Sequence, residues 1–191
     1  MELETKIKTK NSTSSNLDPQ AILDKLELKS GDIIADLGCG SGHFVIPAAK
    51  ITGDKGLVFA IDVLEKRLGA VQSQANLNYL NNIVTGLANL ETAGSVAKIL
   101  KNKKADLIIL SDVLFANDDK NAIIQQVLDN LAPRGRLIII DWENNRHPAA
   151  PSKDMLVSSR EIIELCRKNK LKPLESLPAG QYHWARLFIR A

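Results

Sequence analysis

The chain has 191 residues, of which 45% are hydrophobic, and its 25 basic and 22 acidic side chains leave a net charge of +3. This composition is typical of a globular protein, and no basic run with interleaved aromatic residues points to a nucleic-acid partner. No stretch has the apolar length of a membrane span or of a signal-peptide core, so we expect a soluble, cytoplasmic protein without a membrane partner. Cys39 and Cys166 have neither metal-ligand nor disulfide spacing, so no metal site is predicted.

The N-terminal region divides into two parts. Residues 1–16 are rich in Lys, Thr, Ser and Asn, which predicts a flexible arm, and residues 17–191 predict one domain. Asp18 followed by Pro19 predicts a helix start, because Asp is a favoured N-cap and Pro suits the first helical position.

An apolar strand from Asp32 to Leu37 leads into a loop with glycine at every second position, Gly38, Gly40 and Gly42, and then into a helix. The strand lacks polar alternation, which predicts burial on both faces, as in a parallel sheet. Glycines allow positive φ and close approach of a ligand, and a helix start offers unpaired N–H groups. This stretch therefore predicts a site for a polar, nucleotide-like ligand.

Strands and helices alternate through the rest of the chain. Further strands are expected at 56–61, 83–86, 105–112 and 136–142, with helices near 44–53, 64–79, 95–100 and 123–131. Ser158 and Glu161 form a capping box that opens a last helix, and strands at 171–177 and 182–190 should pair as a hairpin. This pattern predicts an α/β fold with a doubly wound parallel sheet and one antiparallel addition.

Ligands of such sheets bind beyond the carboxyl ends of the strands. The polar residues expected at those ends are Asp36, Asp62, Ser111, Asp112, Asp141 and Glu143.

The glycine spacing separates two kinds of nucleotide ligand. A dinucleotide fingerprint needs G-x-G-x-x-G, but His43 stands where its third glycine belongs, which argues against a pyrophosphate. Asp62, twenty residues after Gly42 at the end of the second strand, suits the hydroxyls of a ribose. No arginine adjoins Asp62, so a 2′-phosphate is not favoured.

The segment Asp36–Gly42 resembles motif I of the Rossmann-like (class I) S-adenosylmethionine-dependent methyltransferases, and Asp62 matches their ribose-binding acid. Ser111–Leu114 is similar to the end of their fourth strand, and Leu131–Leu137 resembles the turn before their fifth. The resemblance covers the chain from about Asp18 onward. It implies a seven-stranded sheet of order 3-2-1-4-5-7-6 with an antiparallel last strand and helices on both faces. It also implies a small methyltransferase domain over 17–191, similar to quinone-biosynthesis methyltransferases.

The resemblance implies S-adenosyl-L-methionine as cofactor, with the glycines and Asp36 near its methionine part, Asp62 on the ribose and Val63 on the adenine. The residues expected to bind it are Asp36, Gly38, Cys39, Gly40, Gly42, Asp62, Val63, Ala88, Asn89 and Ser111. Leu87 stands where the family often has an adenine-contacting Asp, so backbone groups of Leu87 or Ala88, or the Asn89 amide, would have to substitute. Simpler roles stay open: Asp36 as a loop cap, Asp62 as a helix cap and Ser111 as ordinary strand-end polarity.

The expected reaction is methyl transfer by in-line displacement at the sulfonium methyl, which depends mainly on proximity and orientation. A general base is needed only if the acceptor must lose a proton early, so the catalytic residues are unknown. Candidates are Asp112, His147 and His183. No Asn/Asp-Pro-Pro-aromatic run follows the fourth strand, which disfavours amino-group methylation of adenine or glutamine. We therefore expect a small-molecule acceptor and a monomer or homodimer.

Two alternatives remain. Leu87 leaves room for a non-catalytic or accessory protein of the same fold. A nicotinamide-dependent oxidoreductase is the other alternative, and His43 counts against it.

Overall fold

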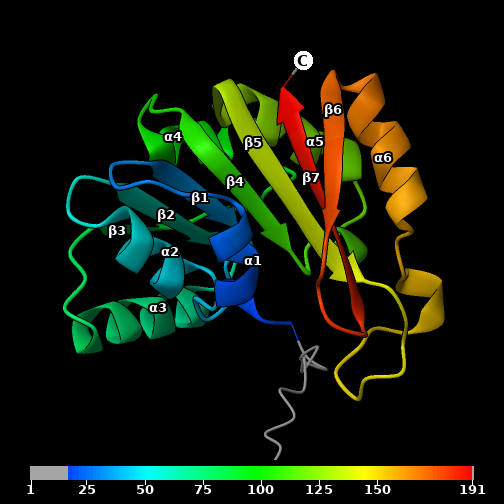
Figure 1. The fold of residues 1–191 in the computed structure, drawn as a ribbon, viewed down its shortest axis with the longest axis horizontal. Helices are drawn as coiled ribbons and strands as arrows, with labels where there is room; N and C mark the ends of the chain where they lie inside the picture. The colour runs from blue at the N-terminus through cyan, green and yellow to red at the C-terminus, as the bar shows by residue number, and fades with distance from the viewer. Residues whose placement is uncertain (1–16, 191) are drawn as a thin grey trace, which may run out of the picture.

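A computed structural model describes residues 17–190, so the predicted arm at 1–16 lies outside the described residues (Figure 1). The elements, in chain order, are α1 (Pro19–Lys25), β1 (Ile33–Leu37), α2 (Val45–Thr52), β2 (Leu57–Asp62), α3 (Glu65–Leu77), β3 (Ile83–Leu87), α4 (Ser95–Leu100), β4 (Ala105–Ser111), η1 (Leu114–Ala116), α5 (Lys120–Asn130), β5 (Leu131–Trp142), η2 (Lys153–Met155), α6 (Ser159–Lys168), β6 (Leu171–Leu177) and β7 (His183–Arg190).

The strands form one seven-stranded sheet of order β3-β2-β1-β4-β5-β7-β6. The pairs β3–β2, β2–β1, β1–β4 and β4–β5 are parallel, and β7 runs antiparallel to both of its neighbours. The predicted fold, strand order and antiparallel last strand are confirmed. Because β1 lies between β2 and β4, the chain reverses its direction of winding at β1, which places a ligand crevice at its carboxyl end.

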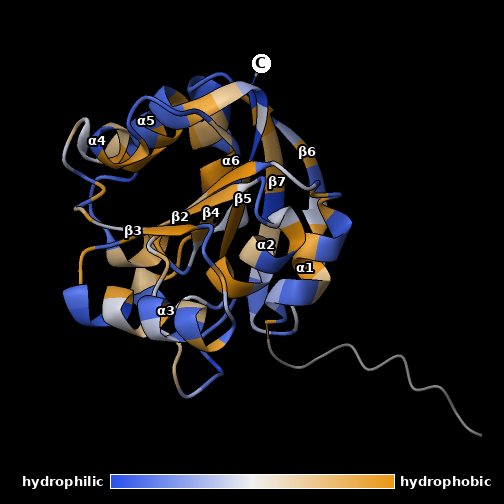
Figure 2. Cartoon of the chain, turned by 90° about the vertical axis from the view of Figure 1, so that its left-hand side faces the viewer, coloured by the Kyte–Doolittle hydropathy of each residue, from blue (hydrophilic) through white to orange (hydrophobic). Residues whose placement is uncertain are grey.

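The sheet lies between two layers of helices (Figures 1 and 2). On one side, α1, α2 and α3 cover a core that includes Ile22, Val45 and Val71. On the other side, α4, α5 and α6 cover a core that includes Val96 and Ile123. Figure 2 shows the strands between the layers as mainly hydrophobic, as expected for strands buried on both faces.

The predicted helix caps form. The Asp18 carboxylate accepts a hydrogen bond from the N–H of Ala21 at 3.1 Å, with Pro19 at the first helical position. Ser158 and Glu161 make both bonds of a capping box at the start of α6. These local contacts determine where α1 and α6 begin.

One boundary prediction was wrong. The fifth strand was expected to begin at Arg136, but β5 begins at Leu131. The expected turn residues are part of β5. They fit into the strand because the β4–β5 register shifts between Ala105 and Leu107. Gly135 makes this possible, since a β-carbon there would lie 2.9 Å from the carbonyl oxygen of Ala105.

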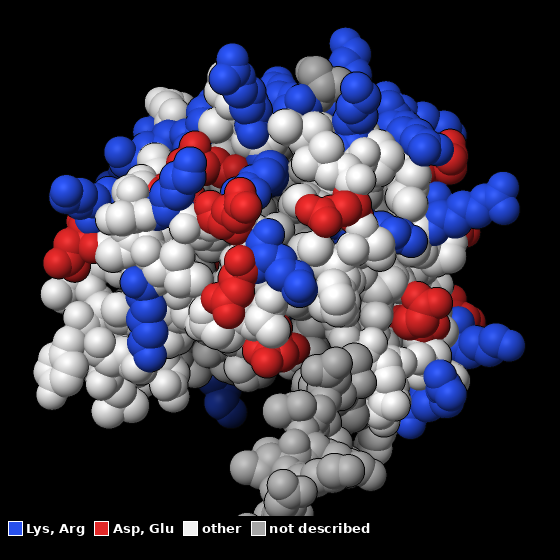
Figure 3. Space-filling model, in the orientation of Figure 1, with Lys and Arg blue, Asp and Glu red and all other residues white. Residues whose placement is uncertain are grey.

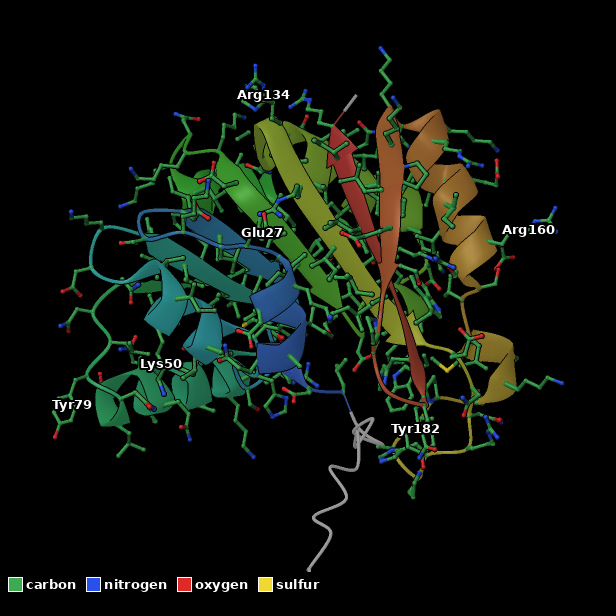
Figure 4. All side chains as sticks on the ribbon, in the orientation of Figure 1. Glu27, Lys50, Tyr79, Arg134, Arg160 and Tyr182 are labelled. Carbon is green, nitrogen blue, oxygen red and sulfur yellow. The ribbon has the colours of Figure 1, made fainter. Side chains whose placement is uncertain are left out.

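Charge is unevenly distributed over the two ends of the sheet. Lys and Arg side chains gather along the upper edge in Figure 3, where the parallel strands begin, and Arg134 marks this edge in Figure 4. Exposed cations of the connecting segments there include Lys101, Lys103, Lys104, Arg134 and Lys170. Within residues 17–190, no helix is long and apolar enough to cross a membrane.

Candidate functional site

Two adjoining cavities of about 350 and 220 Å³ open at the carboxyl ends of β1, β2 and β4. Gly38, Arg67 and Asp112 line both of them. The larger one is also lined by Asp36, Cys39, Gly40 and Ser111, and the smaller one by Asp62, Val63, Ala88 and Asn89. The structure thus brings together every residue that was predicted to bind a cofactor, except Gly42.

The glycine loop is held against β2 and α3. The N–H groups of Gly38 and Cys39 both donate to the carbonyl oxygen of Ile61, at 2.7 and 2.9 Å. Gly38 has φ of +80°, and a β-carbon there would lie 2.5 Å from Val113 Cγ2. Gly42 serves packing instead of lining a cavity: its φ is +91°, and a β-carbon would lie 3.2 Å from Val71 Cγ2.

Asp36 is a buried carboxyl group that forms no ion pair with any cation of residues 17–190. It is 2% exposed, and its Oδ1 has no hydrogen-bond partner among the described residues. Burial, and secondarily the charge of Asp62, raises the pKa of Asp36 to about 8. A loop cap would accept a hydrogen bond from a loop N–H, and no such bond offsets the effect of burial on Asp36, so this arrangement favours the alternative in which Asp36 faces a cationic group of a ligand.

Asp62 links the loop to the start of α3. Its Oδ2 accepts from the N–H of Gly40 and its Oδ1 from the N–H of Leu64, both at 2.9 Å. The N-cap position of α3 is Leu64, and no side chain caps the helix, so the helix-cap role considered from sequence for Asp62 was wrong: its bond to the N–H of Leu64 closes a turn just before α3. A carboxylate has about four acceptor positions, so the two engaged oxygens retain capacity for ligand hydroxyls.

The expectation that no arginine adjoins Asp62 was wrong in three dimensions. The guanidinium of Arg67 lies 3.5 Å from Asp62 Oδ2, because the first turns of α3 bring it back over the strand end. Arg67 also lines both cavities, and sequence reasoning missed it. The sequence signal for Arg67 is its position five residues after Asp62, in the first turn of the helix that follows the strand.

The β3 end differs from the arrangement that the resemblance implied. Leu87 is 60% exposed and lines neither cavity. The N–H of Ala88 donates to the Asp62 carbonyl at 3.0 Å, and Asn89 Oδ1 accepts from the N–H of Glu91 at 2.8 Å. The side-chain NH₂ of Asn89 is thus the polar group of this segment best placed to donate to a ligand.

The three catalytic candidates occupy different positions. Asp112 lines both cavities, and His183 Nε2 lies 3.2 Å from Asp112 Oδ1. His183 stacks on Trp142 with ring centroids 4.1 Å apart. His147 lies in the loop after β5 and lines neither cofactor-sized cavity, although its ring is 5.0 Å from that of Tyr182. Figure 4 shows Tyr182 at the edge where β5 ends.

Asp141 supports the loop after β4. Its Oδ2 accepts from the N–H groups of Leu114 and Phe115 at 3.1 and 3.2 Å, and its Oδ1 from the N–H of Trp142 at 2.8 Å. Burial raises the pKa of Asp141 to about 6 despite these bonds. The residue therefore positions η1 beside the cavities.

Neither cysteine is a reactive thiol in this structure. Cys39 and Cys166 are both buried and free. Burial raises the pKa of the Cys39 thiol, and the charges of Asp36 and Asp62 raise it further. Burial raises the pKa of Cys166 to about 12. Within residues 17–190, no group of three or more His, Cys, Asp or Glu side chains is placed to hold a metal ion.

Two larger cavities, of about 640 and 550 Å³, flank α6. They contain none of the predicted cofactor residues, so size alone does not mark the cofactor site. The cavity of about 550 Å³ borders the site through Phe115, Ala116 and Asn117 of the loop after β4.

Comparisons with known proteins agree with this geometry. A family model described as a methyltransferase domain matches residues 28–187, and the chain belongs to this family. A probable cobalt-precorrin-6B C(15)-methyltransferase (decarboxylating) from Saccharolobus solfataricus is 31% identical over 61% of this chain and 56% of the relative. Ribosomal RNA large subunit methyltransferase E from Neisseria meningitidis is 36% identical over 54% of this chain and 45% of the relative. The chain thus spans about half the length of these curated relatives.

A solved structure has the same fold over nearly the whole chain. The crystal structure of a SAM-dependent methyltransferase from Aquifex aeolicus superposes with a TM-score of 0.80 at 20% identity. The superposition covers 95% of this chain and 94% of the other.

Proposed function

We propose that this protein binds S-adenosyl-L-methionine in the two joined cavities and transfers its methyl group to a small-molecule acceptor. The observation that carries the proposal is the buried carboxyl of Asp36, whose Oδ1 has no partner among residues 17–190 and which lines one cavity while Asp62 lines the other. The cofactor has matching polarity, because its ammonium lies at one end and its ribose near the other. Gly38 lines both cavities, and a β-carbon there would lie 2.5 Å from Val113 Cγ2, so a larger residue would shift the wall that the cavities share.

Each predicted residue that lines a cavity then has a role. Asp36 takes the ammonium, and the loop at Gly38, Cys39 and Gly40 lies along the methionine part. Asp62 uses its remaining acceptor capacity on the ribose hydroxyls. Ser111 contributes a hydroxyl at the methionine end.

Adenine recognition relies on contact and on amide donors. Val63 is 60% exposed at the mouth of the smaller cavity, so its side chain offers an apolar surface to a base. Ala88 lines the same cavity, and the Asn89 NH₂ can donate to a ring nitrogen of the base, which differs from the carboxylate of the family because that group accepts from the adenine amino group.

When bound, the cofactor supplies an electrophilic sulfonium methyl. The protein's own task is to orient the two reactants and to exclude water, which accounts for the lack of an obvious nucleophile. The low reactivity of the buried Cys39 thiol agrees with direct transfer to the acceptor.

The charge distribution favours a small acceptor. Asp36, Asp62 and Asp112 surround the cavities, where Arg67 is the cation that lines both. Many of the exposed Lys and Arg side chains gather at the opposite edge of the sheet (Figure 3). Nucleic-acid binding relies on basic residues that neutralise phosphates, so a site rich in carboxylates suits an RNA substrate poorly. Because one relative is named as a ribosomal RNA methyltransferase, RNA is tested directly as an alternative acceptor.

Calorimetric titration of the purified protein tests the cofactor proposal. We expect saturable binding of S-adenosylmethionine and of S-adenosylhomocysteine, and no binding of NADH or NADPH. Asp62→Ala should weaken binding of both adenosyl compounds by roughly 1–3 kcal/mol, because ribose hydroxyls lose their acceptors. Asp54→Ala, in the turn after α2, is the matched control and should bind normally. Binding of NADPH alone would favour the oxidoreductase instead.

The acceptor class is tested by methyl transfer from labelled S-adenosylmethionine. Label should enter compounds below the mass limit of an ultrafilter when a cell-derived metabolite extract is supplied. Label that enters total RNA, and is released by ribonuclease, would contradict the small-molecule proposal. Cofactor binding without label transfer to either pool would favour the accessory-protein alternative.

A further inference from the structure

The two cavities meet at a place of mixed charge. Of the three residues that line both, Gly38 contributes backbone, Arg67 a cation and Asp112 an anion. Arg67 lies 3.5 Å from Asp62 Oδ2, and its side chain is 52% exposed. Its charge is thus partly neutralised and screened by solvent. Asp112 therefore carries the anionic charge of the junction.

The backbone holds Asp112 in an unusual conformation. Its φ is +56°, in the left-handed region that residues other than glycine seldom adopt. Such strain persists only where the surroundings enforce it, and it concentrates at functional sites. The N–H of Asp112 donates to the carbonyl of Ile140 at 3.0 Å, which fixes the residue to β5.

His183 packs against the Asp112 side chain on the side away from solvent. The imidazole is 7% exposed and stacks on Trp142, and its Nε2 lies 3.2 Å from Asp112 Oδ1. Asp112 Oδ1 and both ring nitrogens are buried, and none makes a hydrogen bond with the described residues. The Asp112 side chain as a whole is 35% exposed. Oδ1 is thus turned toward the imidazole, and Oδ2 is the oxygen available to the cavities.

We infer that Asp112, positioned by His183, is a counter-ion for the sulfonium that makes the site prefer S-adenosylmethionine over S-adenosylhomocysteine. The inference rests on the proposed function. The sulfur joins the adenosyl and methionine parts, so a ligand that fills both cavities places its sulfur at their junction. The two compounds differ there by one methyl group and one positive charge, and are otherwise identical in what they offer to Asp36 and Asp62.

This contact favours turnover through product release and not through the chemical step. Methyl transfer removes the positive charge from sulfur, so the product loses its attraction to Asp112. An interaction with the charged ground state does not accelerate the transfer itself. Its benefit is that the spent cofactor competes less well for the site.

The test is the ratio of the dissociation constants of S-adenosylhomocysteine and S-adenosylmethionine, measured by calorimetry at one pH and at low salt. The wild-type ratio should exceed one. Asp112→Asn keeps the shape and tolerates positive φ, and it should lower the ratio roughly three- to tenfold, as expected for one partly screened charge contact. The same variant should bind S-adenosylhomocysteine about as well as the wild type.

Two further variants separate charge from structure. Asp118→Asn removes the same charge from an exposed position on the same loop and should leave the ratio unchanged. His183→Phe retains an aromatic ring against Trp142 but loses Nε2, and it should lower the ratio in the same direction as Asp112→Asn.

The outcomes distinguish the two levels of the proposal. If the wild type binds neither compound, the proposed function fails and the inference fails with it. If it binds both, a wild-type ratio of one or below overturns the inference alone, even if the Asp112 variant does not fold. An Asp112→Asn protein that folds and keeps the wild-type ratio overturns it as well.

Discussion

Asp36 and Asp62 occupy equivalent places at the ends of adjacent strands, yet the structure gives them different chemistry. Asp62 accepts hydrogen bonds from two N–H donors and lies 3.5 Å from the Arg67 guanidinium. Asp36 lies one strand deeper in the sheet, where Oδ1 has no donor. The difference matters because Asp62 already takes part in the loop's hydrogen bonds, whereas the raised pKa of Asp36 means that it holds a proton until a cation binds.

Proton release should therefore accompany cofactor binding. The pKa of Asp36 is about 8 before binding, so at pH 7 the carboxyl is largely protonated. A bound ammonium favours the carboxylate and expels that proton. The calorimetric enthalpy at pH 7 should then vary with the ionisation enthalpy of the buffer. Asp36→Asn should abolish this dependence and weaken binding by roughly 1–3 kcal/mol. A wild-type enthalpy that is equal in phosphate and Tris buffers would contradict the role.

The same residue predicts a pH dependence of stability. The folded-state pKa of Asp36 lies above its unfolded value of 3.8, so the folded protein binds the proton more tightly. This contribution to stability is fully present below about pH 4 and is lost as the pH rises to about 8. Without ligand at pH 8, Asp36→Asn should therefore have a higher free energy of unfolding than the wild type, measured in urea. Equal or lower stability would show that Asp36 is not strained by burial.

Gly38 and Gly69 provide a matched pair of glycine substitutions. Gly38→Ala places a methyl group 2.5 Å from Val113 Cγ2 at φ of +80°, so it should destabilise the fold by roughly 1–3 kcal/mol and impair cofactor binding. Gly69 lies within α3, and the place that a β-carbon would take is open space, so Gly69→Ala should stabilise by about 0.5–1 kcal/mol. Urea unfolding measures the stability of both variants. A Gly38→Ala protein with wild-type stability would contradict the claim that a β-carbon at Gly38 clashes with Val113.

Site residues could be predicted from the sequence where their position depends on a local motif. Contacts between elements that are distant in the sequence could not be predicted. Asp36, Gly38 and Asp62 follow from a motif because strand ends and loop spacing are local properties. The contacts of Asp62 with Arg67 and of Asp112 with His183 depend on how α3 and β7 lie against the strand ends. His183 was a candidate from sequence, but its partner lies 71 positions away in the chain and was not foreseen.

At the scale of elements, most boundaries could be predicted because caps and apolar runs are strong local signals. The α4 helix at 95–100 and the β6 strand at 171–177 have the predicted limits. The early start of β5 could not be predicted, because Pro133 and Gly135 are typical turn residues. Their pairing is decided by the neighbouring strand, where Ala105 of β4 lies opposite Leu131.

The capping box of α6 should be a measurable element-level contribution. Ser158 accepts from the N–H of Glu161, and Glu161 accepts from the N–H of Ser158 at 3.1 Å. Ser158→Ala should lower the free energy of unfolding by about 1 kcal/mol. Ser73→Ala, at an exposed position within α3, should change it by less than about 0.5 kcal/mol. Equal effects in urea unfolding would indicate that α6 is held by packing of Ile162 and Cys166 alone.

At the scale of the whole molecule, binding chemistry and surface charge lie at opposite ends of the sheet. The carboxylates of the site follow from strand ends, and the cations follow from the segments that precede β4, β5 and β6. The net charge of the chain is only +3, so the composition does not reveal that basic side chains gather at one edge.

This separation predicts that RNA and the cofactor do not compete. Any RNA retained at low salt should be bound by the basic edge and released as salt rises, because its affinity comes from phosphate neutralisation. The triple variant Lys103→Glu, Lys104→Glu, Arg134→Glu should lose that binding in fluorescence anisotropy, yet bind S-adenosylhomocysteine as the wild type does. Excess RNA should leave S-adenosylhomocysteine affinity unchanged. Competition between the two, or loss of cofactor binding in the triple variant, would place the RNA at the carboxyl ends and contradict the small-acceptor proposal.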